Sequence, residues 1–89
     1  MQFEYDSNKS ESNLDKHGID FETAKELWDG DTVEFKANVK GESRSKVIGR
    51  ISGEYWAAIV NVRGGKTRII SVRRATQDER RAYDRYINN

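Results

Sequence analysis

Arginine is unevenly distributed along this chain of 89 residues, and its position suggests phosphate chemistry. All nine arginines lie between Arg44 and Arg85, and none lies in the first 42 residues. Residues 1–42 hold eleven Asp or Glu against five Lys, a net charge of −6, whereas residues 43–89 hold eleven Lys or Arg against four Asp or Glu, a net charge of +7. A guanidinium group matches two phosphate oxygens and stays charged at physiological pH. The pattern favours a nucleic-acid partner; the alternative is an acidic helical layer that neutralises a basic sheet within one fold.

Chemistry on a phosphodiester also needs a proton-transfer group, and the chain offers one histidine, His17. Histidine titrates closest to neutral pH, which suits it to act as a general acid or base. His17 also ends a helical segment just before Gly18, where a cation stabilises the negative end of the helix dipole. Taken alone, the position favours this capping role. Tyr83 and Glu79 are weaker candidates for the proton transfer.

Metal and cofactor sites are not indicated by the sequence. The chain has no cysteine and one histidine, which excludes a Cys/His cluster, and no carboxylate spacing suggests a Mg²⁺ site. No apolar run approaches the ~20 residues that cross a bilayer. The first residues lack the basic start and apolar stretch of a signal peptide. We therefore expect a soluble, cytoplasmic protein without metal or cofactor.

Three helices are predicted from caps and helical spacing. The first covers residues 7–16, with Asp6 as its N-cap and Gly18 as its left-handed stop. The second begins after Asp20 and carries an apolar stripe formed by Phe21, Ala24, Leu27 and Trp28. The last opens with a capping box between Thr76 and Glu79.

The middle of the chain is predicted to form strands, because the hydrophobic period there changes from helical to alternating. Four strands are expected, over residues 32–39, 46–52, 54–63 and 67–74, with a polar loop over residues 40–45. A two-residue hairpin turn at Gly64 and Gly65 would pair Val60 with Ile69, Asn61 with Arg68, and Trp56 with Arg73. The prediction is a single α+β domain over residues 1–89, with a four-stranded antiparallel meander sheet, two N-terminal helices and one C-terminal helix.

In this arrangement an aromatic ring lies beside a guanidinium group, a combination that suits single-stranded RNA because bases stack and phosphates pair. For Trp56 and Trp28, however, packing in the core is the favoured interpretation. For Arg68, Arg73 and Arg74, ion pairs with the carboxylates of the acidic half explain the residues as well as phosphate contacts do.

Two long blocks of the sequence resemble the BrnT family of toxins. They are NLDKHGIDFETA at residues 13–24 and RIISVRRATQDERRAY at residues 68–83, and the opening FEYD, Arg44 and the segment Ile48-Gly49-Arg50 continue the pattern in order. The resemblance covers nearly the whole chain. Two positions depart from the family pattern, since Ser7 replaces a common proline and Ser45 replaces an aromatic residue that often follows the arginine. The missing aromatic residue would weaken a base-stacking contact.

The resemblance implies the toxin of a type II toxin–antitoxin pair, with a RelE-like fold and a ribonuclease activity that stops translation. It also implies an antitoxin of the BrnA type, a ribbon-helix-helix protein that binds DNA. Two toxins on an antitoxin dimer would form a 2:2 heterotetramer, and operator DNA would be reached only through the antitoxin.

RNA cleavage without a metal needs a base for the ribose 2′-hydroxyl, cations for the charge on the phosphorane, and an acid for the leaving oxygen. Arginine cannot supply the base. The family motif makes a functional role for His17 as reasonable as the capping role. We therefore expect catalytic roles for His17, Arg44, Arg50 and Arg73, and RNA binding by Arg68, Arg74, Trp56 and Tyr83. The alternatives are an RNA-binding module without catalysis, or a protein-interaction domain whose basic half docks an acidic partner.

Overall fold

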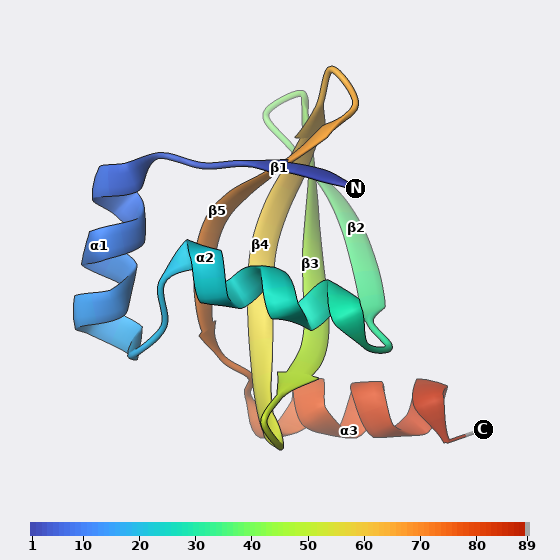
Figure 1. Cartoon of the computed structure of the whole chain (residues 1–89). Coiled ribbons are helices and arrows are strands. Elements are labelled where there is room, and N and C mark those ends of the chain that lie inside the picture. Colours follow the sequence, from blue (N-terminus) through green and yellow to red (C-terminus); the bar gives the residue numbers. More distant parts are fainter. Residues whose placement is uncertain (89) are drawn as a thin grey trace.

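A computed structural model describes residues 1–88, with the side chains of residues 38 and 39 left undescribed. One sheet forms the centre of the structure, with helices on both of its faces (Figure 1). In chain order the elements are β1 (Gln2–Glu4), α1 (Ser7–His17), α2 (Phe21–Ala24), the 3₁₀ helix η1 (Lys25–Asp29), β2 (Val33–Val39), β3 (Glu42–Ile51), β4 (Glu54–Arg63), β5 (Lys66–Arg74) and α3 (Gln77–Ile87).

The predicted helix caps are present. Asp6 accepts hydrogen bonds from the backbone N–H groups at the start of α1, and Gly18 ends that helix with φ 79°. Asp20 accepts from Thr23 N–H at 2.8 Å, and this bond lowers the pKa of the Asp20 carboxyl. The second predicted helix is one α-helical turn, α2, continued by η1.

Polar side chains attach α1 to the sheet. Asn13, which is 6% exposed, donates to the carbonyl oxygens of Ile19 and Val72, both at 2.8 Å, and accepts from Val72 N–H at 3.1 Å. Ser10 Oγ accepts from Phe21 N–H at 2.9 Å. Asn13 therefore bonds the backbone of β5 as a neighbouring strand would, beyond the point where β1 ends. These bonds explain how a helix with few apolar residues holds its place.

The sheet has five strands in the order β1-β5-β4-β3-β2, so the prediction of a four-stranded antiparallel sheet is incomplete. Strands β2 to β5 form the expected antiparallel meander. β1 adds a strand parallel to β5, with Gln2 opposite Lys66 and Glu4 opposite Arg68. The alternation of Phe3 and Tyr5 with polar residues predicts a short extended start of the chain, but its pairing with a distant strand has no local sequence signal.

The loop predicted over residues 40–45 is also wrong. β3 begins at Glu42, and the connection is a tight turn at Lys40 and Gly41, whose φ values are 52° and 80°. Because β3 starts with polar residues on both faces, the hydrophobic alternation that marks a half-buried strand is missing there. The longer strand places Glu42, Arg44 and Lys46 on one face of the sheet.

The predicted β4–β5 register holds near the turn and fails beyond it. Val60 lies opposite Ile69 as expected, but Ile59 lies opposite Ser71, so Ile70 is an extra residue that forms a β-bulge. Arg74 is therefore the partner of Trp56, and Arg73 is the partner of Ala57 on the other face. The bulge separates Trp56 from Arg73, which the sequence placed on the same face.

Each face of the sheet has its own apolar cluster. On one face, α2 and η1 contribute Phe21 and Leu27, which pack with sheet residues that include Val60 and Val72. On the other face, Tyr83 of α3 packs with Ile48, Ala57 and neighbouring apolar residues. Figure 1 shows α3 crossing one end of the sheet, so it covers only part of this second face.

Candidate functional site

Several cations lie on the α3 side of the sheet, and we call four of them, away from its two ends, the basic face: Arg44, Lys46, Arg68 and Arg73. The strand register places them there. Arg44 and Arg68 are both partners of Asn61, Lys46 is the partner of Ile59, and Arg73 is the partner of Ala57. Their side chains are between 33% and 38% exposed, so each guanidinium or ammonium group reaches solvent.

Glu79 of α3 joins two of these cations. Its side chain is 8% exposed and accepts from Arg73 Nη1 and Nη2 at 2.7 and 2.9 Å, while Lys46 Nζ lies at 2.8 Å. Thr76 N–H donates to the same carboxylate at 2.9 Å, which completes the capping box predicted from the sequence. The Arg73 bonds, together with those from Lys46 and Thr76, hold the pKa of the Glu79 carboxyl far below its usual range. Glu79 is thus an ionised group that fixes the positions of Arg73 and Lys46.

The other two members of the basic face pair with more exposed carboxylates. Arg68 Nη1 lies 3.7 Å from Glu4 of β1, and Arg44 Nη2 lies 3.4 Å from Glu42. Exposed pairs of this kind contribute about 0–1 kcal/mol, so they are readily exchanged for a phosphate. Only the Arg68 pair reaches into the N-terminal strand, because Arg73 pairs with Glu79 and Arg74 with Glu54.

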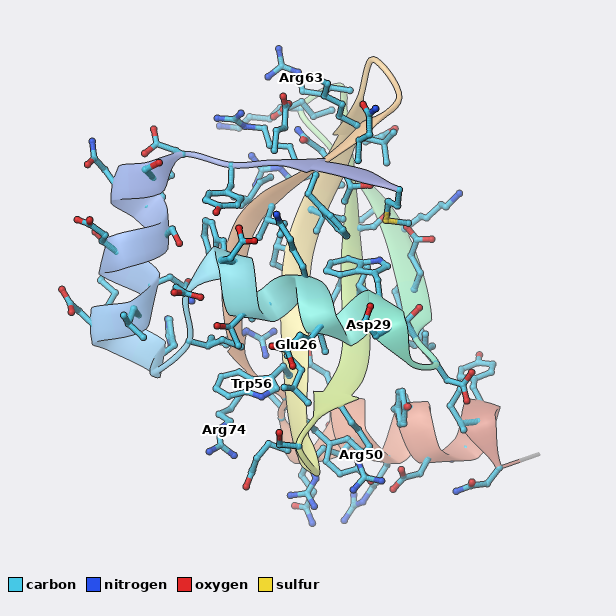
Figure 2. The ribbon with its side chains drawn as sticks, viewed as in Figure 1. Glu26, Asp29, Arg50, Trp56, Arg63 and Arg74 are labelled. Carbon is cyan, nitrogen blue, oxygen red and sulfur yellow. The ribbon has the colours of Figure 1, made fainter. Side chains whose placement is uncertain are left out.

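Arg74 and Trp56 lie on the opposite face, near the end of the sheet (Figure 2). The Arg74 guanidinium stacks 4.8 Å from the centre of the Trp56 ring and pairs with Glu54. Trp56 is 7% exposed and belongs to the core cluster under α2, as the packing interpretation predicted. The bulge in β5 places Arg74 beside Trp56, on the face of the sheet opposite the basic face.

Arg50 lies at the end of the sheet where β3 turns into β4 (Figure 2). Its guanidinium covers the ring of Tyr55 at 4.8 Å, and Arg80 of α3 is also positioned over that ring at 4.7 Å. The Tyr55 hydroxyl donates to Asp84 at 2.8 Å, and this bond raises the pKa of the tyrosine. No hydrogen bond or ion pair among the described residues connects Arg50 with the basic face.

Tyr83 is 7% exposed, and its hydroxyl donates to the backbone oxygen of Asp31 at 3.1 Å. Its ring packs edge-on against Tyr55 at 5.7 Å. Burial is the first cause of the raised pKa of Tyr83. The ring presents no open face for a nucleobase in this structure.

His17 lies at the exposed end of α1. Its imidazole has no hydrogen-bond, ion-pair or ring partner within residues 1–88. Its position is still defined by Asn13, one helical turn earlier, which bonds to Val72 of β5. Figure 1 shows that α1 and β5 run in the same direction, so the C-terminal end of α1, which includes His17, lies toward the same end of the sheet as the C-terminal end of β5.

The sequence interpretation missed three residues of this region: Glu42, Lys46 and Asn61. Lys46 was read as the first residue of a strand, and Glu42 as part of a loop. The spacing of Glu42, Arg44 and Lys46 by two residues is the signal that could have placed all three on one face. Asn61 was predicted opposite Arg68, and this pairing is confirmed, but nothing in the sequence marks its burial.

A cavity of about 790 Å³ opens mainly on the face opposite the basic face. Uncharged side chains that include Trp28, Val60 and Val62 form much of its lining. Arg44 of the basic face also contributes to its lining, so the cavity borders the cation cluster at that residue. Within the described residues, no group of three His, Cys, Asp or Glu side chains is placed to hold a metal ion.

Two comparisons place the chain among known proteins. No curated protein matches it. Residues 5–79 match the family model described as the ribonuclease toxin BrnT of a type II toxin–antitoxin system. Within residues 1–88, no helix is long and apolar enough to cross a membrane. Because the family model covers most of the sequence, from Tyr5 to Glu79, the chain belongs to the BrnT family of ribonuclease toxins.

Proposed function

We propose that this toxin is an endoribonuclease that cleaves RNA on the basic face by attack of a ribose 2′-hydroxyl on the adjacent phosphate, without a metal ion. The observation that carries the proposal is the gathering of Arg44, Lys46, Arg68 and Arg73 on one face, where the ionised Glu79 holds Lys46 and Arg73. Attack by the 2′-hydroxyl adds negative charge to the phosphoryl oxygens. Cations fixed beforehand at that place stabilise the charge without having to reorganise.

Arg73 and Lys46 are the best-positioned members of this set, because Glu79 holds both of them. Arg73 keeps a second guanidinium contact through the backbone oxygen of Arg74 at 3.2 Å. Removal of one donor that stabilises a developing charge slows an enzyme ~10²–10³-fold. Glu79 itself is a poor base, since its lowered pKa means that it holds a proton weakly.

His17 is the proposed proton-transfer group. It lies four residues after Asn13, a rise of about 6 Å along the helix. Asn13 contacts Val72 of β5, and Arg74 lies two residues after Val72, a similar distance of roughly 6.6 Å along the strand. From these two lengths we infer that the anchored helix brings His17 to the level of Arg74 at the sheet edge. RNA that crosses this edge would contact the imidazole and the basic face together.

The proposal extends to the partners of the toxin. A BrnA-type ribbon-helix-helix antitoxin would neutralise it in a 2:2 heterotetramer and would carry the contacts with operator DNA. The toxin would act in the cytoplasm, where its cleavage of RNA would stop translation. A RelE-like fold is consistent with the meander β2 to β5 and its flanking helices.

The test is induced expression of the chain alone, with growth and total RNA followed, together with purified protein and RNA in the presence of EDTA. Wild type should arrest growth and shorten transcripts, and EDTA should leave cleavage unchanged. Arg73→Ala should reduce the cleavage rate ~10²-fold or more. Arg81→Ala is the matched control, because Arg81 is an exposed arginine of α3 outside the basic face.

The results separate the main possibilities. A folded protein that shifts RNA on a gel but leaves it intact would be an RNA-binding module and not a nuclease. Loss of cleavage in EDTA, restored by a divalent cation, would contradict the metal-independent mechanism. If His17→Ala stays fully toxic while Arg73→Ala does not, another residue transfers the proton.

A further inference from the structure

Asn61 lies between two arginines in the middle of the sheet. Arg44 on β3 and Arg68 on β5 are its direct partners across the two neighbouring strands. Asn61 is 5% exposed, whereas the arginine side chains beside it are 38% and 33% exposed. The short polar side chain of Asn61 is therefore buried between two longer cationic side chains that extend toward solvent.

Two buried atoms at this position have no hydrogen-bond partner: Asn61 Oδ1 and Arg44 Nε. They are the two such side-chain atoms found among the described residues, and they belong to partner residues on adjacent strands. A buried donor or acceptor that stays unpaired destabilises the fold by its full desolvation penalty. Because both atoms belong to one pair of facing residues, we expect a ligand to bind there and to supply the missing hydrogen bonds.

The two atoms define the chemistry of that ligand. Arg44 Nε can only donate a hydrogen bond, and Asn61 Oδ1 can only accept one. A phosphate oxygen accepts but does not donate, so phosphate alone would leave Asn61 Oδ1 unpaired. A hydroxyl group both accepts and donates, and it can therefore bond to both atoms at once. In RNA each ribose carries such a group at its 2′ position.

Glu42 occupies the approach to this pair in the free protein. Its carboxylate accepts from Asn61 Nδ2 at 3.0 Å and lies 3.4 Å from Arg44 Nη2. The Glu42 side chain is 52% exposed, so it can swing into solvent on the timescale of surface rotamer changes. A nucleotide phosphate would replace the carboxylate at Arg44, and the adjacent ribose would reach Asn61.

We propose that Asn61 and Arg44 form a ribose-binding subsite in which Asn61 Oδ1 accepts a hydrogen bond from an RNA 2′-hydroxyl, after a phosphate displaces Glu42. The subsite distinguishes RNA from nucleic acids that lack this donor. This inference rests on the proposed function, since it assumes that RNA binds the basic face. It adds a specificity residue to the charged groups that stabilise the reaction.

The experiment compares a short mixed-sequence RNA with the same sequence carrying 2′-fluoro sugars, which keep the ribose pucker but cannot donate. Binding is followed by stopped-flow anisotropy at low temperature, and a denaturing gel of quenched samples verifies that the RNA is intact. The proteins are wild type, Asn61→Leu and Asn61→Thr. Val62→Thr is the matched control, because Val62 is the next residue of β4, on the other face and 61% exposed. Circular dichroism and thermal unfolding identify the Asn61 variant that folds.

Wild type and the Val62 control should bind ribose RNA about three- to tenfold more tightly than the 2′-fluoro form, the range of one net hydrogen bond. In the folded Asn61 variant this ratio should fall toward one, which is the signature of direct coupling in a double-mutant cycle. Glu42→Gln should raise the affinity for both oligonucleotides by a similar factor, because it removes a competing charge.

An unchanged ratio in the Asn61 variants would overturn the subsite, and so would a wild type that binds both sugars equally. If the variant loses affinity equally for both sugars, Asn61 contacts a base or the backbone, which also contradicts the proposal. If the wild-type protein still cleaves RNA in any of these cases, the proposed ribonuclease function remains supported although the subsite is wrong. Failure to bind or cleave either oligonucleotide would overturn both.

Discussion

Among single side chains, Glu79 both caps helix α3 and holds two cations of the basic face. The capping box predicted from the sequence explains its bond with Thr76, and the strand register adds Lys46 and Arg73. Four donors satisfy a carboxylate that is 8% exposed, which is the condition under which a buried charge is stable. The same bonds hold two cations of the basic face in place.

The first prediction concerns the stability that Glu79 contributes. Its folded pKa is lowered, so the unfolded state, with a carboxyl pKa near 4.5, takes up a proton first as the pH falls. The contribution is therefore fully present above about pH 5 and declines as the pH falls below that value toward the folded pKa. Glu79→Gln should lower the free energy of unfolding at pH 7 by about 2 kcal/mol and flatten the acid limb of the stability curve.

Urea unfolding between pH 2.5 and pH 7 measures both effects. Asp78→Asn is the matched control, because Asp78 is the preceding residue and its side chain is 95% exposed. A Glu79→Gln curve parallel to that of wild type would show that Glu79 does not supply the acid dependence.

At the level of secondary structure, the attachment of α1 through Asn13 leads to the second prediction. Asn13→Ala would leave the N–H and carbonyl of Val72 without their partners at the edge of β5. The expected loss is about 2–3 kcal/mol of unfolding free energy, because a buried polar group is left unpaired. Amide exchange at Val72 should accelerate at the same time. Asn8→Ala, on an exposed position of α1, should change neither quantity appreciably; a similar effect of both substitutions would contradict the anchor.

The elements that the sequence revealed are those with local signals. The caps at Asp6, Asp20 and Thr76 are side-chain bonds over two or three residues, and the glycine hairpin is equally local. The pairing of β1 with β5 was missed because it depends on residues far along the chain, and the extension of β3 was missed because its polar residues give no hydrophobic alternation. The bulge at Ile70 was missed because the alternation of β5 gives no indication of an extra residue.

The candidate site could be predicted as a set of residue types but not as an arrangement. Arginine-rich strands were evident from the sequence, and Arg44 and Arg73 do lie on one face. One extra residue in β5 exchanged the faces of Arg73 and Arg74, since a shift of one position reverses the side of every later side chain of that strand. The ion pairs of Arg73 and Lys46 with Glu79 required the packing of α3 on the sheet, which no spacing in the sequence encodes.

For the molecule as a whole, the separation of charge along the chain becomes a separation in space only in part. Glu4 and Glu42, from the acidic half, lie against the basic face, so its charge is partly balanced before RNA arrives.

The third prediction follows from the four cations of the basic face. The affinity for single-stranded RNA should fall with salt, with a log–log slope of about −0.7 per phosphate contact, and so about −3 in total.

Arg44→Ala should make that slope less negative by about 0.7, whereas Arg81→Ala should leave it unchanged. Anisotropy titrations between 50 and 300 mM salt would measure it, because a slope of about −3 lowers the affinity by roughly two decades over that range. Equal slopes for the two variants would show that binding does not depend on the basic face.

The last prediction concerns the antitoxin, the partner that membership in this family implies. In the free toxin the cations of the basic face are paired with Glu4, Glu42 and Glu79, so the surface accommodates carboxylates. An antitoxin that covers this surface with acidic side chains would bind the same cations as RNA does. Purified antitoxin should therefore displace labelled RNA completely, and Arg44→Ala and Arg68→Ala should weaken both complexes while Arg81→Ala weakens neither. A stable ternary complex of toxin, antitoxin and RNA would place the antitoxin elsewhere, and the cavity whose lining includes Trp28, Val60 and Val62 would then be the next surface to test.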